Sequence, residues 1–240
     1  MKSFVLMLQF LTRIPIPISI DMDQKTISRG LFFFPLVGMV IGCIAWVVYY
    51  VFGFLSRAVM GAVAATGGLH VDGLSDTCDG FFSSRTREKI LEIMKDSRVG
   101  TFGVIAILFD FLARYSIIRD LPQNAAFPAF VLVFGASRLG AAMLITFGKN
   151  ARSGGLGEMF SSGSKKGIFF LSFAVFSLLS VWIGGWSFLI CLAAMLLFCL
   201  LLMRYSYKII GGLTGDVYGA GIELSEIVGL IVFLVVERWI

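Results

Sequence analysis

The uncharged stretch from residue 167 to residue 203, GIFFLSFAVFSLLSVWIGGWSFLICLAAMLLFCLLLM, decides the fold class. It is 37 residues long, whereas a helix needs only about 20 apolar residues to cross the hydrocarbon core of a bilayer. The stretch is too long for one span, and Gly184-Gly185 near its middle predicts the turn of a helical hairpin. It therefore predicts two adjacent membrane spans.

Other apolar stretches add to this pair. Those of span length are 30–56, 99–118 and 127–147. The stretch after Arg57 is uncharged only to Val71, and the last candidate, 227–236, is short unless its helix begins near Val217. The chain has 58% hydrophobic residues, 15% charged residues and a mean hydropathy of +0.92. This composition excludes an ordinary soluble globular protein. We expect an all-α, polytopic integral membrane helix bundle of about six to seven transmembrane helices, forming a single domain over residues 1–240.

The basic residues indicate the orientation of these spans, because cytoplasmic loops of membrane proteins collect Lys and Arg. If the N-terminus is cytoplasmic and the chain crosses seven times, 15 Lys and Arg fall on the cytoplasmic side and only Arg57, Arg119 and Arg238 fall outside. We therefore expect three polar loops to face the cytoplasm. The net charge of +5 then reflects membrane topology rather than nucleic-acid binding.

The first polar loop reads HVDGLSDTCDG over residues 70–80. Asp72, Asp76 and Asp79 are spaced four and three apart, so a helix would place their carboxylates on one face. Mg²⁺ is usually held by a few carboxylates together with substrate phosphates, and we expect a metal site here rather than only an acidic helix start. His70 is a candidate general base or proton shuttle, or else a structural hydrogen-bonding residue.

Two cationic segments offer phosphate-binding groups. Lys95 and Arg98 directly precede a predicted span, where they would bind phosphate oxygens or only anchor the span. The second loop reads KNARSGGLG over residues 149–157. Its glycines let backbone N–H groups turn towards an anion, and Arg152 supplies charge. We expect Lys95, Arg98 and Arg152 to bind phosphate, with a flexible linker as the alternative for the second loop.

The third loop reads GGLTGDVYGAGIELSE over residues 211–226. In a helix, Asp216, Glu223 and Glu226 share a face and would lie near the cytoplasmic mouth of the last span. Buried acids in a membrane are costly and are usually functional or paired. The alternative is that these acids pair with Arg138 or Arg114 inside the bundle.

Six motifs, taken in chain order, resemble one family. They are TRIPIP (12–17), FPLVG (34–38), GGLHVDGLSDTCDG (67–80), MKDSRVGTFG (94–103), ARSGGLG (151–157) and GLTGD (212–216). Together they resemble cobalamin synthase, the adenosylcobinamide-GDP ribazoletransferase family, from about residue 10 to residue 226.

The resemblance implies a Mg²⁺-dependent phosphotransferase of late vitamin B12 biosynthesis, with the whole chain as one membrane-embedded transferase domain. Such an enzyme joins adenosylcobinamide-GDP to α-ribazole or its 5′-phosphate, giving adenosylcobalamin or its 5′-phosphate, and releases GMP. The family's motifs imply that Asp72, Asp76 and Asp79, with Asp216 and Glu223, hold the metal.

The resemblance also implies a multi-pass protein of a bacterial or archaeal cytoplasmic (inner) membrane, with the N-terminus and the active-site loops in the cytoplasm. Its partners would be the two substrates and membrane lipid, without nucleic acid. The oligomeric state, including a homo-oligomer, stays open.

Two other functions remain as alternatives. A CDP-alcohol-type phospholipid phosphotransferase also uses clustered aspartates at a cytoplasmic membrane face, but its usual order of Asp-Gly, Ala-Arg and Asp-x-x-x-Asp does not occur in this sequence. A cation transporter would line a path with intramembrane charges, here Asp110, Arg114, Arg138 and Glu226. Against it, the acids of this chain cluster at one membrane face.

Overall fold

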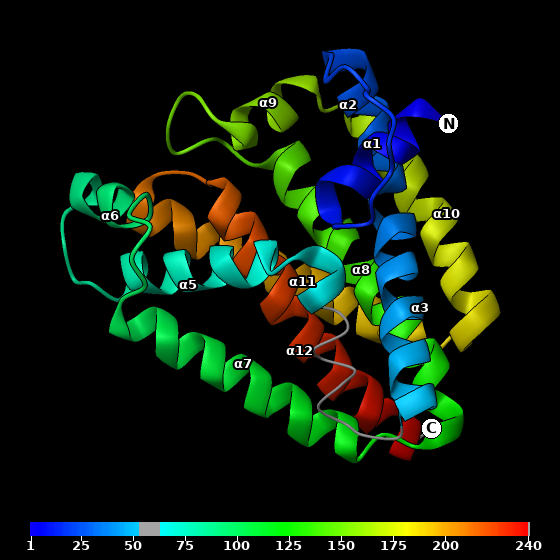
Figure 1. Ribbon diagram of the computed structural model, residues 1–240. Coiled ribbons are helices and arrows are strands. Elements are labelled where there is room, and N and C mark those ends of the chain that lie inside the picture. Colours follow the sequence, from blue (N-terminus) through cyan, green and yellow to red (C-terminus); the bar gives the residue numbers. More distant parts are fainter. Residues whose placement is uncertain (53–62, 240) are drawn as a thin grey trace.

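The chain folds into a bundle of long helices with short helices at one side (Figure 1). A computed structural model describes residues 1–52 and 63–239. The helices are α1 (Lys2–Leu11), α2 (Gln24–Gly30), η1 (Leu31–Phe33), α3 (Phe34–Phe52), α5 (Leu69–Phe81), α6 (Arg87–Ile93), α7 (Thr101–Arg119), η2 (Gln123–Ala125), α8 (Ala126–Phe147), α9 (Leu156–Gly163), α10 (Lys166–Gly184), α11 (Phe188–Ile210) and α12 (Gly215–Trp239). These two ranges contain no β-strand, only an isolated bridge between Asn150 and Leu213.

Six helical segments of the described chain are long and apolar enough to cross a membrane, which confirms the expected all-α polytopic membrane protein. They are Gln24–Val51, Thr101–Arg119, Gln123–Phe147, Lys166–Gly184, Phe188–Ile210 and Gly215–Arg238. The predicted hairpin is confirmed, because α10 ends at Gly184 and Gly185 turns the chain with a φ of +74°. The last span does begin early enough to cross, at Gly215.

The second predicted span, from Arg57 to Val71, lies partly outside the described residues. In its described part, residues 63–66 are helical, and α5 begins at Leu69 after Gly67 and Gly68. Both glycines take positive φ, which turns the chain into α5. Helix α5 is not one of the six span-length segments, so the first polar loop of the sequence is a short helix.

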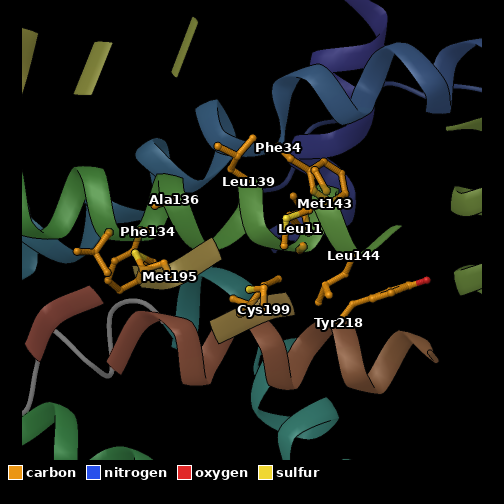
Figure 2. Close-up of a cluster of buried hydrophobic side chains, with 14 of the residues drawn as sticks. Leu11, Phe34, Phe134, Ala136, Leu139, Met143, Leu144, Met195, Cys199 and Tyr218 are labelled. Atoms are coloured by element: carbon orange, nitrogen blue, oxygen red, sulfur yellow. The ribbon is translucent and has the colours of Figure 1, made fainter. Parts of the chain in front are cut away.

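Helix α8 is the centre of the bundle. In its most apolar 18-residue stretch, 89% of the residues are buried inside the protein, whereas the corresponding share is 22% in α7 and also in α10. Helix α3 packs on α8 through Gly38 and Gly42, where an added Cβ would overlap the α8 backbone. Small residues at such contacts let two membrane helices approach closely. Figure 2 shows the buried cluster around α8, to which α11 contributes Met195 and Cys199.

The two sides of the bundle differ. Helices α6 and α9 lie towards the upper left of Figure 1, whereas the C-terminus and the ends of α7 and α10 lie at the lower right. Trp182 and Trp186 flank the hairpin turn at that second side and are 82% and 77% exposed. Trp is enriched where membrane proteins meet the membrane–water interface. We call the side with α6 and α9 the loop face.

Candidate active site

The three aspartates of α5 differ in how far they are buried. Asp72 is exposed, Asp76 is half-buried and Asp79 is buried. The carboxylates therefore meet three different environments although one helix carries them all.

Asp79 holds the start of α7. Its Oδ2 accepts a hydrogen bond from the backbone N–H of Gly100 at 2.7 Å, and its Oδ1 accepts one from Gly103 at 2.8 Å. A Cβ at either glycine would overlap the carboxylate. The first N–H groups of a helix lack intrahelical partners, and a carboxylate there is favoured by the helix dipole. This capping role was not expected from the sequence, and the metal-ligand role of Asp79 stays a prediction.

Helices α5 and α12 approach each other through two glycines. A Cβ at Gly73 of α5 would lie 2.8 Å from the carbonyl oxygen of Asp216, and one at Gly219 of α12 would lie 3.1 Å from that of His70. Because no side chain separates the two backbones, Asp216 lies beside the α5 aspartates. The two segments meet although more than 130 residues separate them in the sequence.

The acids near this contact repel one another. Burial raises the pKa of Asp76 to about 7, and the negative charges of Asp72, Asp216 and Asp79 contribute to the rise. Arg152 acts in the opposite direction. No three His, Cys, Asp or Glu side chains in the described ranges converge closely enough to form a metal site by themselves. We call Asp72, Asp76 and Asp216 the acidic cluster. A bound cation would reduce the repulsion between their carboxylates.

The glycine-rich second loop lies against the start of α12. The backbone N–H of Ala151 donates to Leu213 at 2.8 Å, and Leu213 N–H donates to Lys149 at 2.7 Å. These bonds place Arg152 next to the acidic cluster, with its Nη2 3.5 Å from Oδ2 of Asp216. The predicted phosphate-binding role of Arg152 stays a prediction.

A cavity of about 180 Å³ opens between the second loop and α12. Arg152, Gly154 and Gly155 line it together with Asp216. The Nη1 atom of Arg152 is buried there and has no hydrogen-bond partner among the described residues. A buried guanidinium N–H without a partner is the type of group that binds an anion.

The other two predicted phosphate-binding residues lie apart from this cluster. Lys95 is exposed in the segment between α6 and α7. The Arg98 side chain is 87% exposed and pairs with the neighbouring Asp96, Nη2 to Oδ2 at 2.6 Å. Among the described residues, no ion pair joins Lys95 or Arg98 to Asp72, Asp76 or Asp216, and their phosphate-binding role stays a prediction.

His70 is buried where α5, α8 and α12 meet. Its Nδ1 lies 3.2 Å from Nη2 of Arg138 and 3.9 Å from Oε1 of Glu223. A guanidinium only donates hydrogen bonds, so the Nδ1 atom that faces Arg138 carries no hydrogen and the ring is neutral.

The intramembrane charges pair with one another. Arg114 donates to both carboxylate oxygens of Asp110 at 3.0 Å and also pairs with Glu223 and Glu226. Arg138 pairs with Glu226 from the other side. Glu223 therefore pairs with Arg114 inside the bundle, which is the alternative that the sequence left open. Its role as a metal ligand stays a prediction.

A second cavity lies between α5, α12 and the N-terminal part of the chain. Its aromatic lining was not predicted from the sequence. It is lined by His70, Asp72 and Asp216, and by aromatic side chains from α1, α3 and α9. These aromatic residues are Phe10, Phe34 and Phe160. In the sequence they look like ordinary apolar helix residues, and only tertiary packing brings them to the acids.

The chain is similar to a sequence family over nearly its whole length. Residues 3–234 match the family described as cobalamin-5-phosphate synthase. Adenosylcobinamide-GDP ribazoletransferase of Clostridium novyi is 38% identical over 98% of this chain and 97% of its own length. The enzymes of the same name from Clostridium tetani (38% identity, 97% of this chain and 96% of its own) and Listeria welshimeri (38%, 100% and 99%) are equally similar. No solved structure matches the chain. The chain therefore belongs to the cobalamin-5-phosphate synthase family.

Proposed function

We propose that this protein is an adenosylcobinamide-GDP ribazoletransferase, which joins adenosylcobinamide-GDP to α-ribazole or its 5′-phosphate and releases GMP. Family membership over nearly the whole chain supports the overall reaction. The observation that carries the site assignment is the convergence of three motif segments, 67–80, 151–157 and 212–216, at one place on the loop face. Residues far apart in the sequence form one site there.

In this reaction an acceptor hydroxyl attacks the phosphorus next to cobinamide, and GMP departs. Catalysis of such a transfer depends mainly on positioning and on neutralising the phosphate oxygens. Arg152 supplies a cation at the 180 Å³ cavity, and its Nη1 has no hydrogen-bond partner among the described residues. Gly154 and Gly155 beside it leave room for the diphosphate.

Mg²⁺ fits the donor chemistry of the acidic cluster. Asp72, Asp76 and Asp216 offer only carboxylate oxygens, and burial, together with the negative charges of the neighbouring acids, raises the pKa of Asp76. Mg²⁺ is usually bound by one or two carboxylates plus substrate phosphates, so a three-residue protein cage is not required. When bound, the ion would neutralise the phosphate oxygens during transfer. Asp79 accepts hydrogen bonds from the start of α7, so we propose that one or two carboxylates of the acidic cluster hold the ion together with substrate phosphate.

We place the protein in the cytoplasmic membrane of a bacterium, with the loop face in the cytoplasm. The relatives named above are bacterial. The distribution of Lys and Arg supports this orientation, since only Arg57, Arg119 and Arg238 fall on the opposite side of the seven-span topology. Cytoplasmic nucleotide substrates would then reach the acidic cluster directly.

A transporter is a weaker explanation of the intramembrane charges. Asp110, Arg114, Arg138 and Glu226 neutralise one another across α7, α8 and α12. The small cavity at this network, lined by Arg114 and Glu226, has a volume of only about 10 Å³, which is too small for a hydrated ion to pass. The phospholipid transferase alternative is not favoured by the family match.

The direct test uses purified protein in liposomes with adenosylcobinamide-GDP, α-ribazole and Mg²⁺. We expect GMP and the joined corrinoid to form in equal amounts. Omitting α-ribazole should abolish GMP release, which separates transfer from hydrolysis. GMP release that does not depend on α-ribazole, or transfer of a CDP-alcohol instead, would contradict the proposal.

A further inference from the structure

The cavity beside the acidic cluster has an aromatic wall. Its volume is about 150 Å³. The ring centroids of Phe10 and Phe160 are 4.6 Å apart, and those of Phe34 and Phe160 are 6.1 Å apart. Figure 2 shows Leu11 and Phe34 near α8, with Tyr218 extending from α12. All five residues line the cavity, so its surface is mostly apolar and suited to a flat ring.

One end of this cavity is polar. Asp72 and Asp216 line it and also belong to the acidic cluster. Asp216 and Gly215 line the phosphate-side cavity as well. A ligand whose apolar part enters the aromatic cavity would therefore have its polar part beside the acids and near Arg152.

Two residues that line the aromatic cavity each have a buried polar atom without a partner. His70 is 3% exposed and Tyr218 is 7% exposed, and neither His70 Nε2 nor the Tyr218 hydroxyl has a hydrogen-bond partner among the described residues. Buried polar groups in folded proteins are nearly always hydrogen-bonded. A ligand with a hydrogen-bond acceptor would satisfy such a donor once the side chains that cover it move aside.

The contact with Arg138 determines what His70 offers. A guanidinium only donates hydrogen bonds, so the Nδ1 atom that faces Arg138 Nη2 at 3.2 Å must accept. The hydrogen of the neutral ring is then on Nε2. His70 thus presents an N–H donor, and Arg138 is the positioning residue that keeps the hydrogen there.

We propose that this cavity binds the flat aromatic base of the ribazole acceptor, with His70 Nε2–H or the Tyr218 hydroxyl donating to the free ring nitrogen of the base. This inference rests on the proposed function and deepens it. The base of ribazole is a methylated benzimidazole, which has an apolar surface and one free ring nitrogen. Its ribose would then lie beside Asp72 and Asp216, where the acceptor hydroxyl is needed.

The size and polarity of the cavity argue against the other substrate groups. Its volume of about 150 Å³ is small beside a corrin macrocycle. Guanine is small enough to enter, but it carries an amide, an amino group and two ring nitrogens. Most of these would lose water without finding partners among Phe10, Phe34 and Phe160, and such losses are costly.

Binding of α-ribazole and of free dimethylbenzimidazole to the purified protein, measured by calorimetry without the second substrate, tests the inference. A Cβ at Gly157 would lie 3.4 Å from Gly215 N and 3.6 Å from the Tyr218 ring, so Gly157→Leu can extend into the cavity without a backbone clash. Gly167→Leu is the matched control, because a Cβ there meets nothing within 4 Å and Gly167 is not a lining residue. We expect Gly157→Leu to weaken binding of both ligands at least tenfold and Gly167→Leu to change it less than twofold.

The aromatic wall has a matched pair of its own. Phe160 and Phe169 are both buried, but only Phe160 lines the cavity. Phe160→Leu should therefore weaken binding of dimethylbenzimidazole, whereas Phe169→Leu should not.

The donor is tested with two variants of His70. His70→Gln keeps an N–H near the place of Nε2, and His70→Asn keeps a polar group only near Nδ1. In a Tyr218→Phe background, which removes the second donor, we expect His70→Asn to bind α-ribazole about tenfold more weakly than His70→Gln, as for the loss of one buried hydrogen bond. Equal affinity in the two variants would exclude His70 as the donor.

Several results would overturn the inference. They are α-ribazole binding that is unchanged in Gly157→Leu, absence of α-ribazole binding to the wild type, and displacement of α-ribazole by GMP from a site that Gly157→Leu blocks. These results are distinct from failure of the proposed function. Turnover with an unchanged KM for α-ribazole in Gly157→Leu would support the transferase function but exclude this cavity as the binding site. Binding of α-ribazole that Gly157→Leu weakens, without any GMP release by the wild type, would support the cavity but contradict the function.

Discussion

Asp79 and Asp76 occupy the same helix face, and replacing each by Asn should have opposite consequences. In Asp79→Asn the side chain keeps its shape, but only one of its two polar atoms can accept a hydrogen bond. The amide nitrogen would then face a backbone N–H of Gly100 or Gly103, each of which now donates to a carboxylate oxygen. We expect Asp79→Asn to destabilise the fold even when no metal is present.

The magnitude follows from these two contacts. A hydrogen bond to a charged group contributes about 1.5–3 kcal/mol, and a buried donor left without a partner costs about 1–3 kcal/mol. Partial relaxation of the first turn of α7 reduces the sum, so we expect a loss of about 2–4 kcal/mol. In a protein of this length each kcal/mol shifts Tm by about 2–4 °C, which gives a decrease of roughly 4–16 °C.

Thermal unfolding in detergent with a thiol-reactive fluorophore measures this loss. The buried thiols of Cys191 and Cys199 become reactive only on unfolding. Asp96→Asn is the matched control, because its carboxylate is at the surface and pairs with the exposed Arg98. We expect that control to melt as the wild type does.

Two outcomes would refute the capping role of Asp79. One is an unchanged Tm of Asp79→Asn in EDTA. The other is a loss of stability that appears only in the presence of Mg²⁺, since this would make Asp79 a metal ligand instead of a helix cap.

The remaining predictions concern the acidic cluster and its orientation. Asp76→Asn should abolish GMP release without lowering Tm, because burial and the negative charges of the neighbouring acids disfavour the ionised carboxylate in the folded protein; turnover close to that of the wild type at saturating Mg²⁺ would remove Asp76 from the site. The folded-state pKa of Asp76, about 7, lies above the usual value of 3.8, so its contribution to stability is complete below about pH 4 and is lost as the pH rises towards 7. Melting curves of the metal-free protein should show this decline relative to Asp76→Asn, and parallel pH profiles would contradict it. In Mg²⁺ thermal-shift titrations, Asp76→Asn and Asp216→Asn should each weaken the metal response, and the double variant should lose less than the sum of the single losses; additive losses would place the two acids in separate sites. Cysteines at Ser84 and Ser153, both exposed on the loop face, should resist an impermeant reagent added outside intact cells, and their labelling would reverse the proposed orientation.

The span-length stretches could be read from the sequence because hydrophobicity and length act locally. A run such as 167–203 can satisfy its backbone in lipid only as helices, and two glycines in its middle are enough to place the turn. The second predicted span shows the limit of this rule. Its apolar residues run directly into α5, whose aspartates belong at the loop face, and hydrophobicity alone does not say where a helix ends.

The sequence also identified the chemically active segments, since three aspartates in eight residues are unusual beside a membrane span. It could not assign separate roles to them. Asp72, Asp76 and Asp79 have the same chemistry and similar spacing, so only their neighbours distinguish them. Asp79 meets the start of α7 and becomes a cap, whereas Asp76 meets Asp216 and becomes part of a repulsive cluster.

Glu223 and the aromatic wall show what tertiary structure alone decided. Glu223 was a plausible partner for the aspartates by helical spacing, but Arg114 comes from another helix and takes its carboxylate. Phe10, Phe34 and Phe160 lie on three helices and meet only when α1, α3 and α9 pack together. Sequence determines helix length, membrane location and the inventory of reactive groups because these depend on neighbours along the chain. Which groups face one another depends on how helices distant in sequence pack, and that is decided only in the folded bundle.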